Sequence, residues 1–232
     1  MVLSTISGSN QHVPLLLDYG VEEASGAIYM VYDYFGHMNV FSMLSSSYSL
    51  FEVKRIMRGV LRAIQAAKTR SMIHRDVKHT NVVYDLEKAE ARLIDWGQAV
   101  FHIPGVPLTL NVGTSVFKPP ELLISFPLYD YSVDIWAAGH LLACLTFNVE
   151  SLFPPGNIEQ LLPQLAALLG TQGFLEYCEK RRIPLSFTQE TVLRQCEGAR
   201  PSWGKFLGQN NRELATPEAI DLLEKMLVLN PE

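Results

Sequence analysis

Four polar residues near the middle of the chain have the types and the spacing that phosphoryl transfer requires. They are Asp76, Lys78, Asn81 and Asp95, within the segment MIHRDVKHTNVVYDLEKAEARLIDWGQA, residues 72–99. An Asp can accept the proton of an attacking hydroxyl, and a Lys two residues further on can pair with a phosphate oxygen. Amide and carboxylate oxygens are ligands that Mg²⁺ prefers in the company of phosphates. The set therefore supplies a base, a cation and a metal clamp.

Two short strands are needed to bring these residues together. The runs VVYD and ARLID, residues 82–85 and 91–95, are rich in apolar residues and are separated by the polar stretch LEKAE. This pattern predicts a β-hairpin. Because a hairpin returns the chain to its starting point, Asp95 is expected beside the loop that carries Asp76 and Asn81.

The rest of the chain predicts a mostly helical α+β protein. Residues 13–35 favour two apolar strands around the polar turn GVEEASG, and residues 36–48 favour a linker. Residues 50–70 place their apolar side chains on one face of a helix. Residues 98–128 contain several Pro and Gly with little periodicity, which predicts a long ordered loop. Further helices are predicted over 132–147, 157–169, 172–181, 189–195 and 216–229.

Composition excludes several classes of protein. Hydrophobic residues make up 48% and charged residues 19%, which is typical of a globular chain. The net charge of −5 argues against a general nucleic-acid binder. The apolar run IWAAGHLLACLTF contains His140 and is too short to cross a membrane, and the N-terminus lacks the pattern of a signal peptide. Three cysteines without a CxxC pair favour reduced thiols in an intracellular protein, cytoplasmic or nuclear.

Several motifs, in order along the chain, resemble those of one enzyme family. HRDVKHTN resembles the catalytic loop of eukaryotic protein kinases, in its serine/threonine form, and DWG resembles their DFG motif. RLIDWGQAVFHIPG, FKPPELL, YDYSVDIWAAGHLLA and LLGTQGFLEY are similar to the catalytic (alpha) subunit of casein kinase II. The resemblance extends over nearly the whole chain, from about residue 2 to residue 232. It implies a protein-kinase-like fold, mainly the helical C-lobe with a residual strand pair of the N-lobe.

The resemblance implies a role for each of the four residues named first. Asp76 is then the catalytic base that orients the acceptor hydroxyl, and Lys78 neutralises the transferring phosphate. Asn81 and Asp95 hold Mg²⁺, so that ATP and Mg²⁺ are the expected cofactors. Taken singly, these residues have plain structural readings, because a His-Arg-Asp triplet is usually a solvated turn. The ordered set is what favours a kinase.

The resemblance also implies an adenine pocket and two structural carboxylates. Tyr32 guards the rear of the pocket, the hinge is formed by Asp33, Tyr34 and Phe35, and Val83 forms the floor. The structural pair consists of Asp134, expected to accept hydrogen bonds from the backbone near His74 and Arg75, and of Glu121, expected to anchor the end of the activation segment.

Parts of a kinase N-lobe are missing from the sequence. No GxGxxG loop precedes the catalytic loop, and residues 1–50 contain no Lys or Arg, so the first such cation is Lys54. By the resemblance, residues 1–35 are a remnant of the N-lobe with its last strands and hinge. Residues 36–232 are a C-lobe that is truncated before its C-terminal end. We expect negligible kinase turnover from this chain alone.

Two interpretations of these gaps remain open. One is a truncated chain of an active kinase, favoured because Asp76, Lys78, Asn81 and Asp95 are all present. The other is an inactive kinase-like scaffold that binds partners. A phosphate-binding hydrolase of different origin would need a Ser or Cys nucleophile with its base, and no such motif is found.

Substrates and partners follow from the resemblance alone. The family implies protein substrates with acidic residues after the acceptor, selected by basic side chains near the activation segment. Lys118 keeps such a charge, whereas Asn111 and Ser115 do not.

Thr109, Thr114 and Ser115 are candidate phosphorylation sites. Residues 13–35 correspond to part of the surface that binds a casein kinase II beta-type regulatory subunit; neither nucleic acid nor a membrane is expected as a partner.

Overall fold

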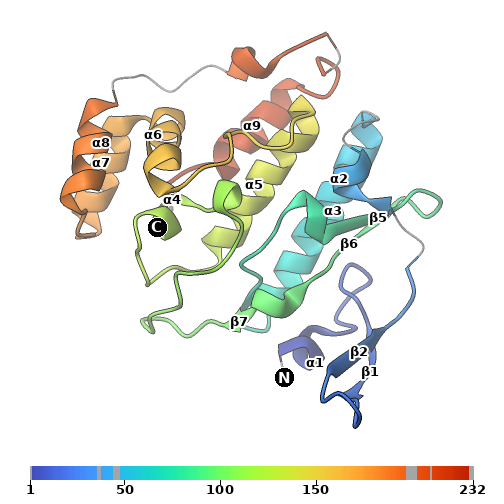
Figure 1. Ribbon diagram of the computed structural model, residues 1–232. Coiled ribbons are helices and arrows are strands. Elements are labelled where there is room, and N and C mark those ends of the chain that lie inside the picture. The colour runs from blue at the N-terminus through green and yellow to red at the C-terminus, as the bar shows by residue number, and fades with distance from the viewer. Residues whose placement is uncertain (1, 36–37, 44–47, 197–202, 210, 230–232) are drawn as a thin grey trace.

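The computed structural model shows a helical body with a β-hairpin projecting from one end (Figure 1). It describes all residues except 1, 36–37, 44–47, 197–202, 210 and 230–232. The helices α6, α7 and α8 lie at the end of the body opposite the hairpin, and α3, α5 and α9 lie between. This arrangement places the predicted catalytic segment in the middle of the molecule.

Nine α-helices and seven strands are found in the described part of the chain. The helices are α1 Val2–Ile6, α2 Val40–Met43, α3 Leu50–Lys68, α4 Pro120–Leu123, α5 Ser132–Phe147, α6 Ile158–Leu169, α7 Thr171–Lys180, α8 Phe187–Gln195 and α9 Pro217–Met226. The strands are β1 Leu16–Val21, β2 Ile28–Tyr32, β3 Met38–Asn39, β4 Met72–Ile73, β5 Val82–Asp85, β6 Glu90–Leu93 and β7 Val100–Phe101.

Helix α5 is the centre of the core. All its residues except Ser132 and Ile135 are buried, as expected for a helix that is apolar on every side. Helix α9 crosses it closely, because a Cβ at Gly139 would lie only 2.8 Å from Cβ of Met226. A glycine is therefore required at this crossing. The position of α5 fixes the predicted catalytic loop, because Asp134 in its first turn accepts hydrogen bonds from the backbone of His74 and Arg75.

Helix α3 lies beside α5 and covers one face of the β5–β6 hairpin. It begins with a capping box, in which the Ser49 and Glu52 side chains accept each other's backbone N–H groups. The strands β5 and β6 pair antiparallel, with Val82 opposite Leu93. Because side chains alternate along a strand, Val82 and Tyr84 pack in the core, while Val83 points to the other face.

The structure confirms most of the predicted elements and corrects others. The two N-terminal strands, the β5–β6 hairpin and all six long helices are present, with ends shifted by up to three residues. The polar turn of the first hairpin is shorter than predicted, since Gly20 and Val21 belong to β1. The prediction of a loop over 98–128 was wrong in part, because this stretch contains β7, a 3₁₀ turn and α4.

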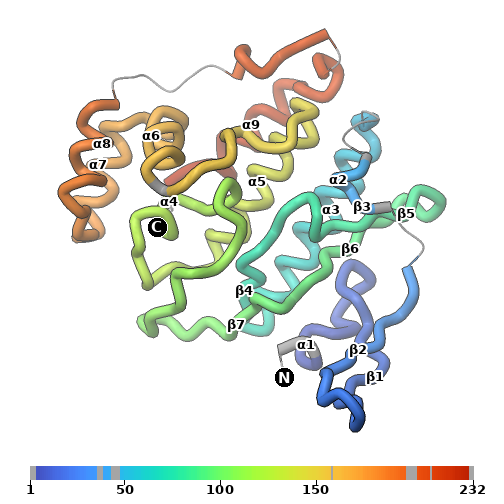
Figure 2. Tube along the Cα trace, in the orientation of Figure 1, coloured from blue at the N-terminus to red at the C-terminus, as the bar shows by residue number. Residues whose placement is uncertain are grey.

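The correction at β7 has a physical reason. This two-residue strand pairs with β4, which lies far from it in sequence but beside it in space (Figure 2). Such a short pairing leaves no periodic signal in the sequence.

Among the described residues, no helix combines the length and the apolar character that crossing a bilayer requires.

Candidate active site

The loop after β4 is held in place by a carboxylate from α5. The backbone N–H groups of His74 and Arg75 donate to Oδ2 and Oδ1 of Asp134, at 2.7 and 2.8 Å. This confirms the contact that the resemblance implied. Arg75 has a φ of 71°, in the left-handed region that non-glycine residues rarely adopt. The two hydrogen bonds stabilise that conformation and so fix the direction in which Asp76 leaves the strand.

Burial governs the charge of the groups beneath the loop. It raises the pKa of Asp134 to about 6, although the two backbone hydrogen bonds act in the opposite direction. Burial also lowers the pKa of His74 to about 4, so this ring is neutral at pH 7. Its Nδ1 accepts from the backbone N–H of Asp76 at 3.2 Å, and its Nε2 donates to the carbonyl oxygen of Ile94 at 3.2 Å. His74 thus links the Asp76 loop to the end of β6.

Asp76 lies at the centre of a hydrogen-bonded cluster. Its Oδ2 lies 2.9 Å from Nζ of Lys78, and its Oδ1 accepts from the Thr114 hydroxyl at 2.9 Å. Nζ of Lys78 also donates to that hydroxyl, at 2.8 Å. The amide of Asn81 donates to Oδ2 of Asp76 at 3.1 Å and to its carbonyl oxygen at 2.9 Å. The structure therefore places an aliphatic hydroxyl between a carboxylate and an ammonium group.

Sequence reasoning missed the role of Thr114, which was named only as a candidate phosphorylation site. Its position depends on Gly113, which has a φ of 73° and donates its N–H to Oε1 of Gln98 at 2.7 Å. A Cβ at Gly113 would lie 2.8 Å from the carbonyl oxygen of Arg75, so the segment can approach the loop only through a glycine. The contact joins segments that are far apart in the sequence, and no residue type or spacing indicates it.

Asp95 and Asn81 meet as the hairpin predicted. The backbone N–H of Ile94 donates to the carbonyl oxygen of Asn81 at 2.8 Å, which places Asp95 next to it. The exposed Asp95 has a φ of 59°, and its Oδ1 accepts weakly from Gly97 at 3.4 Å. Because the amide nitrogen of Asn81 is bonded to Asp76, its side-chain oxygen is the group left for a ligand.

The donor set fits a metal that is held partly by other ligands. The described residues contain no group of three or more His, Cys, Asp or Glu side chains that could hold a metal ion. One carboxylate and one amide oxygen are too few for a dedicated metal cage. They fit Mg²⁺, which is usually bound by one or two carboxylates together with waters and the phosphates of a nucleotide.

Three of the residues assigned to the adenine pocket, Asp33, Phe35 and Val83, lie beside Arg92. The backbone partner of Arg92 across the β5–β6 hairpin is Val83, which is 3% exposed. The Arg92 guanidinium lies 2.6 Å from Oδ2 of Asp33 and 4.3 Å from the ring centre of Phe35. Partial burial and, to a smaller extent, the charge of nearby Asp95 raise the pKa of Tyr32. Asp33 and Phe35 therefore lie where the segment after β2 meets the β5–β6 hairpin, whereas Tyr32 is the last residue of β2 and Val83 belongs to β5.

Arg92 is the second residue that sequence reasoning missed. It fixes the segment after β2 to the β5–β6 hairpin through its ion pair with Asp33. Partial burial raises the pKa of this carboxyl, but hydrogen bonds from Arg92 and from the backbone outweigh that effect and lower it. The backbone N–H of Asp33 donates to the carbonyl oxygen of Leu15. No periodicity or motif in the sequence indicates such a pairing.

The segment from Asp95 to Glu121 is folded onto the catalytic loop. Nε of Arg75 donates to the carbonyl oxygen of Gln98 at 2.6 Å, and its Nη1 donates to the Tyr129 hydroxyl at 3.2 Å. At the far end, Glu121 is buried and accepts from the Ser132 hydroxyl at 3.3 Å. Burial raises the pKa of Glu121 to about 7. These contacts hold both ends of the segment against the body of the protein.

One comparison with known proteins covers almost the entire chain. The family model described as "Protein kinase domain" matches residues 5–232. The match includes the catalytic loop, the segment that follows Asp95 and the helical body.

Proposed function

The chain belongs to the protein kinase family, and from this premise we propose that it is the catalytic part of a serine/threonine kinase. Such an enzyme transfers the γ-phosphate of ATP to hydroxyl groups of proteins. The observation that carries the proposal is the Thr114 hydroxyl, which bonds to both Asp76 and Lys78. This contact supports the proposal, because an aliphatic hydroxyl lies at hydrogen-bonding distance from the proposed base and the proposed cation. A Ser or Thr side chain of a substrate has the same chemistry.

Asp76 and the side chains around it have separate roles in the proposed reaction. Asp76 orients the acceptor hydroxyl and accepts its proton, and Lys78 compensates the negative charge on the phosphate as it moves. Asn81 keeps Asp76 in position through its amide and offers its remaining oxygen to Mg²⁺, together with Asp95. When bound, the metal supplies charge neutralisation between the phosphates.

The nucleotide side of the proposal rests on four residues. The buried side chain of Val83 points away from the main core and supports the adenine ring from below. Tyr32, Asp33 and Phe35 border the ring, with backbone groups of this segment as hydrogen-bonding partners. Arg92 stabilises this border through Asp33 and Phe35.

The casein kinase II-like identity is the finer part of the proposal. Lys118 follows the 3₁₀ turn Ser115–Phe117 beside the catalytic loop, and its charge favours an acidic substrate. A beta-type regulatory subunit would bind the β1–β2 hairpin, whose apolar side chains are exposed. The three cysteines are free, which agrees with an intracellular location in the cytoplasm or nucleus.

A second candidate function is favoured by one observation. Residues 1–50 contain no Lys or Arg, so no cation ahead of Lys54 is present in this chain to hold the ATP phosphates. A kinase-like protein without this clamp would bind partners rather than transfer phosphate. The exposed hairpin would then be its binding surface.

Phosphoryl transfer by the protein isolated from its own cells separates the two candidates. We expect labelled Ser and Thr peptides with ATP and Mg²⁺, no labelled Tyr peptide, and no transfer by an Asp76→Asn variant produced in the same cells. Labelling of Tyr alone would refute the serine/threonine proposal. Absence of both ATP binding and transfer would favour the binding protein. The intact mass, compared with 26.0 kDa, shows whether further chain accompanies this sequence.

A further inference from the structure

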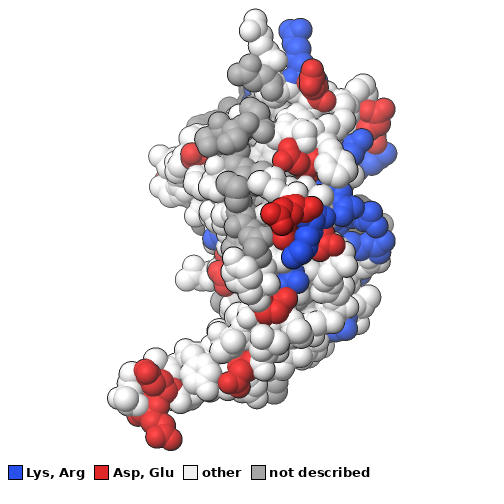
Figure 3. Space-filling view, turned by 90° about the vertical axis from the view of Figure 1, so that its right-hand side faces the viewer, with Lys and Arg blue, Asp and Glu red and all other residues white. Residues whose placement is uncertain are grey.

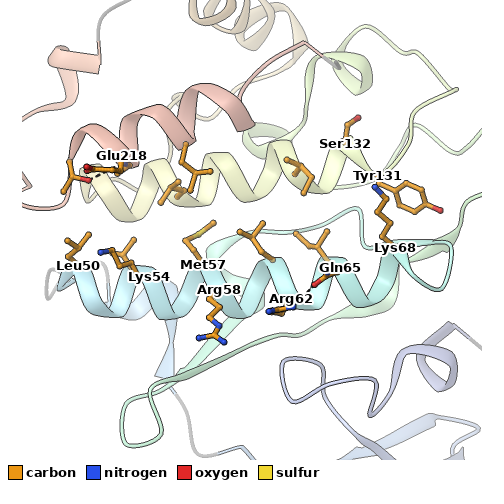
Figure 4. A pocket seen from close by; sticks show the side chains of 18 of the residues that line it. Leu50, Lys54, Met57, Arg58, Arg62, Gln65, Lys68, Tyr131, Ser132 and Glu218 are labelled. Atoms are coloured by element: carbon orange, nitrogen blue, oxygen red, sulfur yellow. Dashed lines mark hydrogen bonds between the residues drawn. The ribbon is translucent and has the colours of Figure 1, made fainter. Parts of the chain in front are cut away.

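Four arginines line one pocket on the outer side of α3. The pocket has a volume of about 640 Å³, and its arginines are Arg55, Arg58, Arg62 and Arg70. Figure 4 shows Arg58 pointing away from the groove between α3, α5 and α9, into which Met57 points. On the face shown in Figure 3, Lys and Arg gather along one side at mid-height, whereas Asp and Glu spread over its whole length. Basic charge is thus concentrated in a chain with a net charge of −5.

The walls of this arginine pocket are held together by hydrogen bonds between three separate segments. Nδ2 of Asn10, in the loop after α1, donates to the carbonyl oxygen of Arg62 at 3.0 Å. Nδ1 of His12 donates to the carbonyl oxygen of Ala91 on β6 at 2.8 Å. Nε of Arg55 donates to the carbonyl oxygen of Ala89 at 2.7 Å. The hollow is therefore a built feature of the fold and not a gap between mobile side chains.

The arginines of the pocket lack carboxylate partners. Within the described part of the chain, none of the four forms a salt bridge, and the one acidic residue of the lining, Glu90, accepts a hydrogen bond from Gln11 at 3.2 Å. Arg55, Arg58 and Arg62 are three and four residues apart on one helix, a spacing at which like charges destabilise the helix. Uncompensated charge of this kind favours an anionic ligand.

Lys54, on the same helix, shows the contrast. It lines the α3–α5–α9 groove and does not line the arginine pocket. Backbone and Thr216 hydrogen bonds and, to a smaller extent, the charge of Lys54 lower the pKa of Glu218, which lines the same groove. Lys54 therefore has an acidic neighbour across the groove, which Arg58 and Arg62 also line, whereas Arg55 and Arg70 line the arginine pocket and not the groove.

We propose that the arginine pocket binds a small molecule with several phosphate groups, either a free polyphosphate or the headgroup of a polyphosphorylated lipid. Guanidinium groups bind phosphate oxygens in pairs, and Arg is the side chain best suited to this geometry. Nε bonds to the carbonyl oxygens of Ala89 and Thr5 orient Arg55 and Arg70. The remaining Nη groups of Arg55 have no hydrogen-bond partner among the described residues. A volume of about 640 Å³ is that of a small-molecule site.

Titration calorimetry on the complete chain tests the site, with inositol hexakisphosphate and inorganic tripolyphosphate as probes. The double variant Arg58→Gln/Arg62→Gln should weaken binding by at least about tenfold, because two bidentate donors are lost. The matched control Lys54→Gln removes one charge from the other side of the helix and should change the affinity by less than about twofold. Circular dichroism and thermal unfolding verify that each variant is folded.

A third variant keeps the site testable if the double Gln variant does not fold. Arg58→Lys/Arg62→Lys retains the charge but not the paired donors, and it should still weaken binding severalfold. Sedimentation with phosphatidylcholine vesicles, with and without a phosphatidylinositol bisphosphate, identifies the source of the ligand. Binding to a free polyphosphate or to the vesicles that contain the bisphosphate supports the site. No binding of any probe by the unmodified chain, or equal losses in the Lys54 and arginine variants, would overturn the proposal.

Discussion

The β1–β2 hairpin and helix α5 are both rich in apolar residues, but they use them in opposite ways. On the hairpin, Tyr19 is 69% exposed and Ile28 is 76% exposed. On α5, Leu141 and Leu145 are fully buried, and even Asp134 is 1% exposed. The hairpin also projects from the body, whereas α5 lies at its centre (Figure 1).

The difference shows which parts of the site are positioned by the chain itself. A two-stranded hairpin with both faces exposed is marginally stable alone, and exposed apolar surface of this kind marks a site of interaction. The catalytic loop instead rests on α5, which is surrounded by its own core. We therefore expect substitutions on α5 to change the stability of the whole domain, and substitutions on the hairpin to change little. The predictions below test that contrast.

Asp134→Ala is the largest expected effect, because it removes the link between α5 and the catalytic loop. It leaves the backbone N–H groups of His74 and Arg75 buried without acceptors. We expect the free energy of unfolding to fall by about 3 to 5 kcal/mol, measured by urea denaturation. The control Asp221→Ala removes an exposed carboxylate of α9 and should cost less than about 0.5 kcal/mol. Similar losses in both variants would contradict the role of α5.

Glu121→Gln tests burial at the other end of the site, through the dependence of stability on pH. Between the ordinary value of 4.5 and about 7, folded Glu121 keeps a proton that the unfolded chain has lost. The folded state then binds more protons, so the free energy of unfolding of the unmodified protein falls as pH rises through this window. The fall attributable to Glu121 is about 3 kcal/mol at most.

The Gln variant lacks this fall, so its stability relative to the unmodified protein should increase with pH. The buried His74 and His140, whose pKa values are lowered to about 4 and about 3, add an opposite slope in both proteins. They cancel in the difference between the two urea denaturation curves. Parallel pH profiles would show that Glu121 ionises normally and that its burial has no consequence.

Thr114→Val is expected to have a smaller effect, confined to the catalytic loop. Valine has nearly the same shape but cannot bridge Asp76 and Lys78. We expect a loss of about 1 kcal/mol in the free energy of unfolding, measured by urea denaturation. Thr114→Ser keeps the hydroxyl and should remain within about 0.5 kcal/mol of the unmodified protein. A loss in Thr114→Ser with none in Thr114→Val would mean that the methyl group, rather than the bridge, holds Thr114.

Much of this architecture could be predicted because it depends on local patterns. The apolar face of α3 and the alternation in β5 and β6 are visible in the sequence, and the Asp134 contact followed from the resemblance. These features rest on helix and strand periods or on ordered motifs. The roles of Asp76, Lys78, Asn81 and Asp95 in catalysis remain a proposal, although the structure places them together.

The features that could not be predicted depend on contacts between distant segments. Thr114 reaches Asp76 across 38 positions, and Arg92 reaches Asp33 across 59. The pairing of β7 with β4 involves only two residues on each strand. The arginine pocket combines α3 with a loop that precedes it by some forty residues. Neither residue type nor spacing reports such contacts until the fold is known.

The smallest expected effect tests the hairpin side of the contrast. Val21 and Ile28 are opposite each other in the β1–β2 hairpin, and Val21 is 61% exposed. Val21→Thr should change the free energy of unfolding by less than about 0.5 kcal/mol, because threonine also favours strands and its hydroxyl stays in water. The same substitution at the fully buried Val82 should cost about 1 to 3 kcal/mol, because the hydroxyl enters the core. Urea denaturation measures both. A loss at Val21 as large as that at Val82 would mean that the hairpin packs against the body in solution. The catalytic loop and the segment Tyr32, Asp33 and Phe35, proposed to border the adenine ring, would then unfold as one cooperative unit.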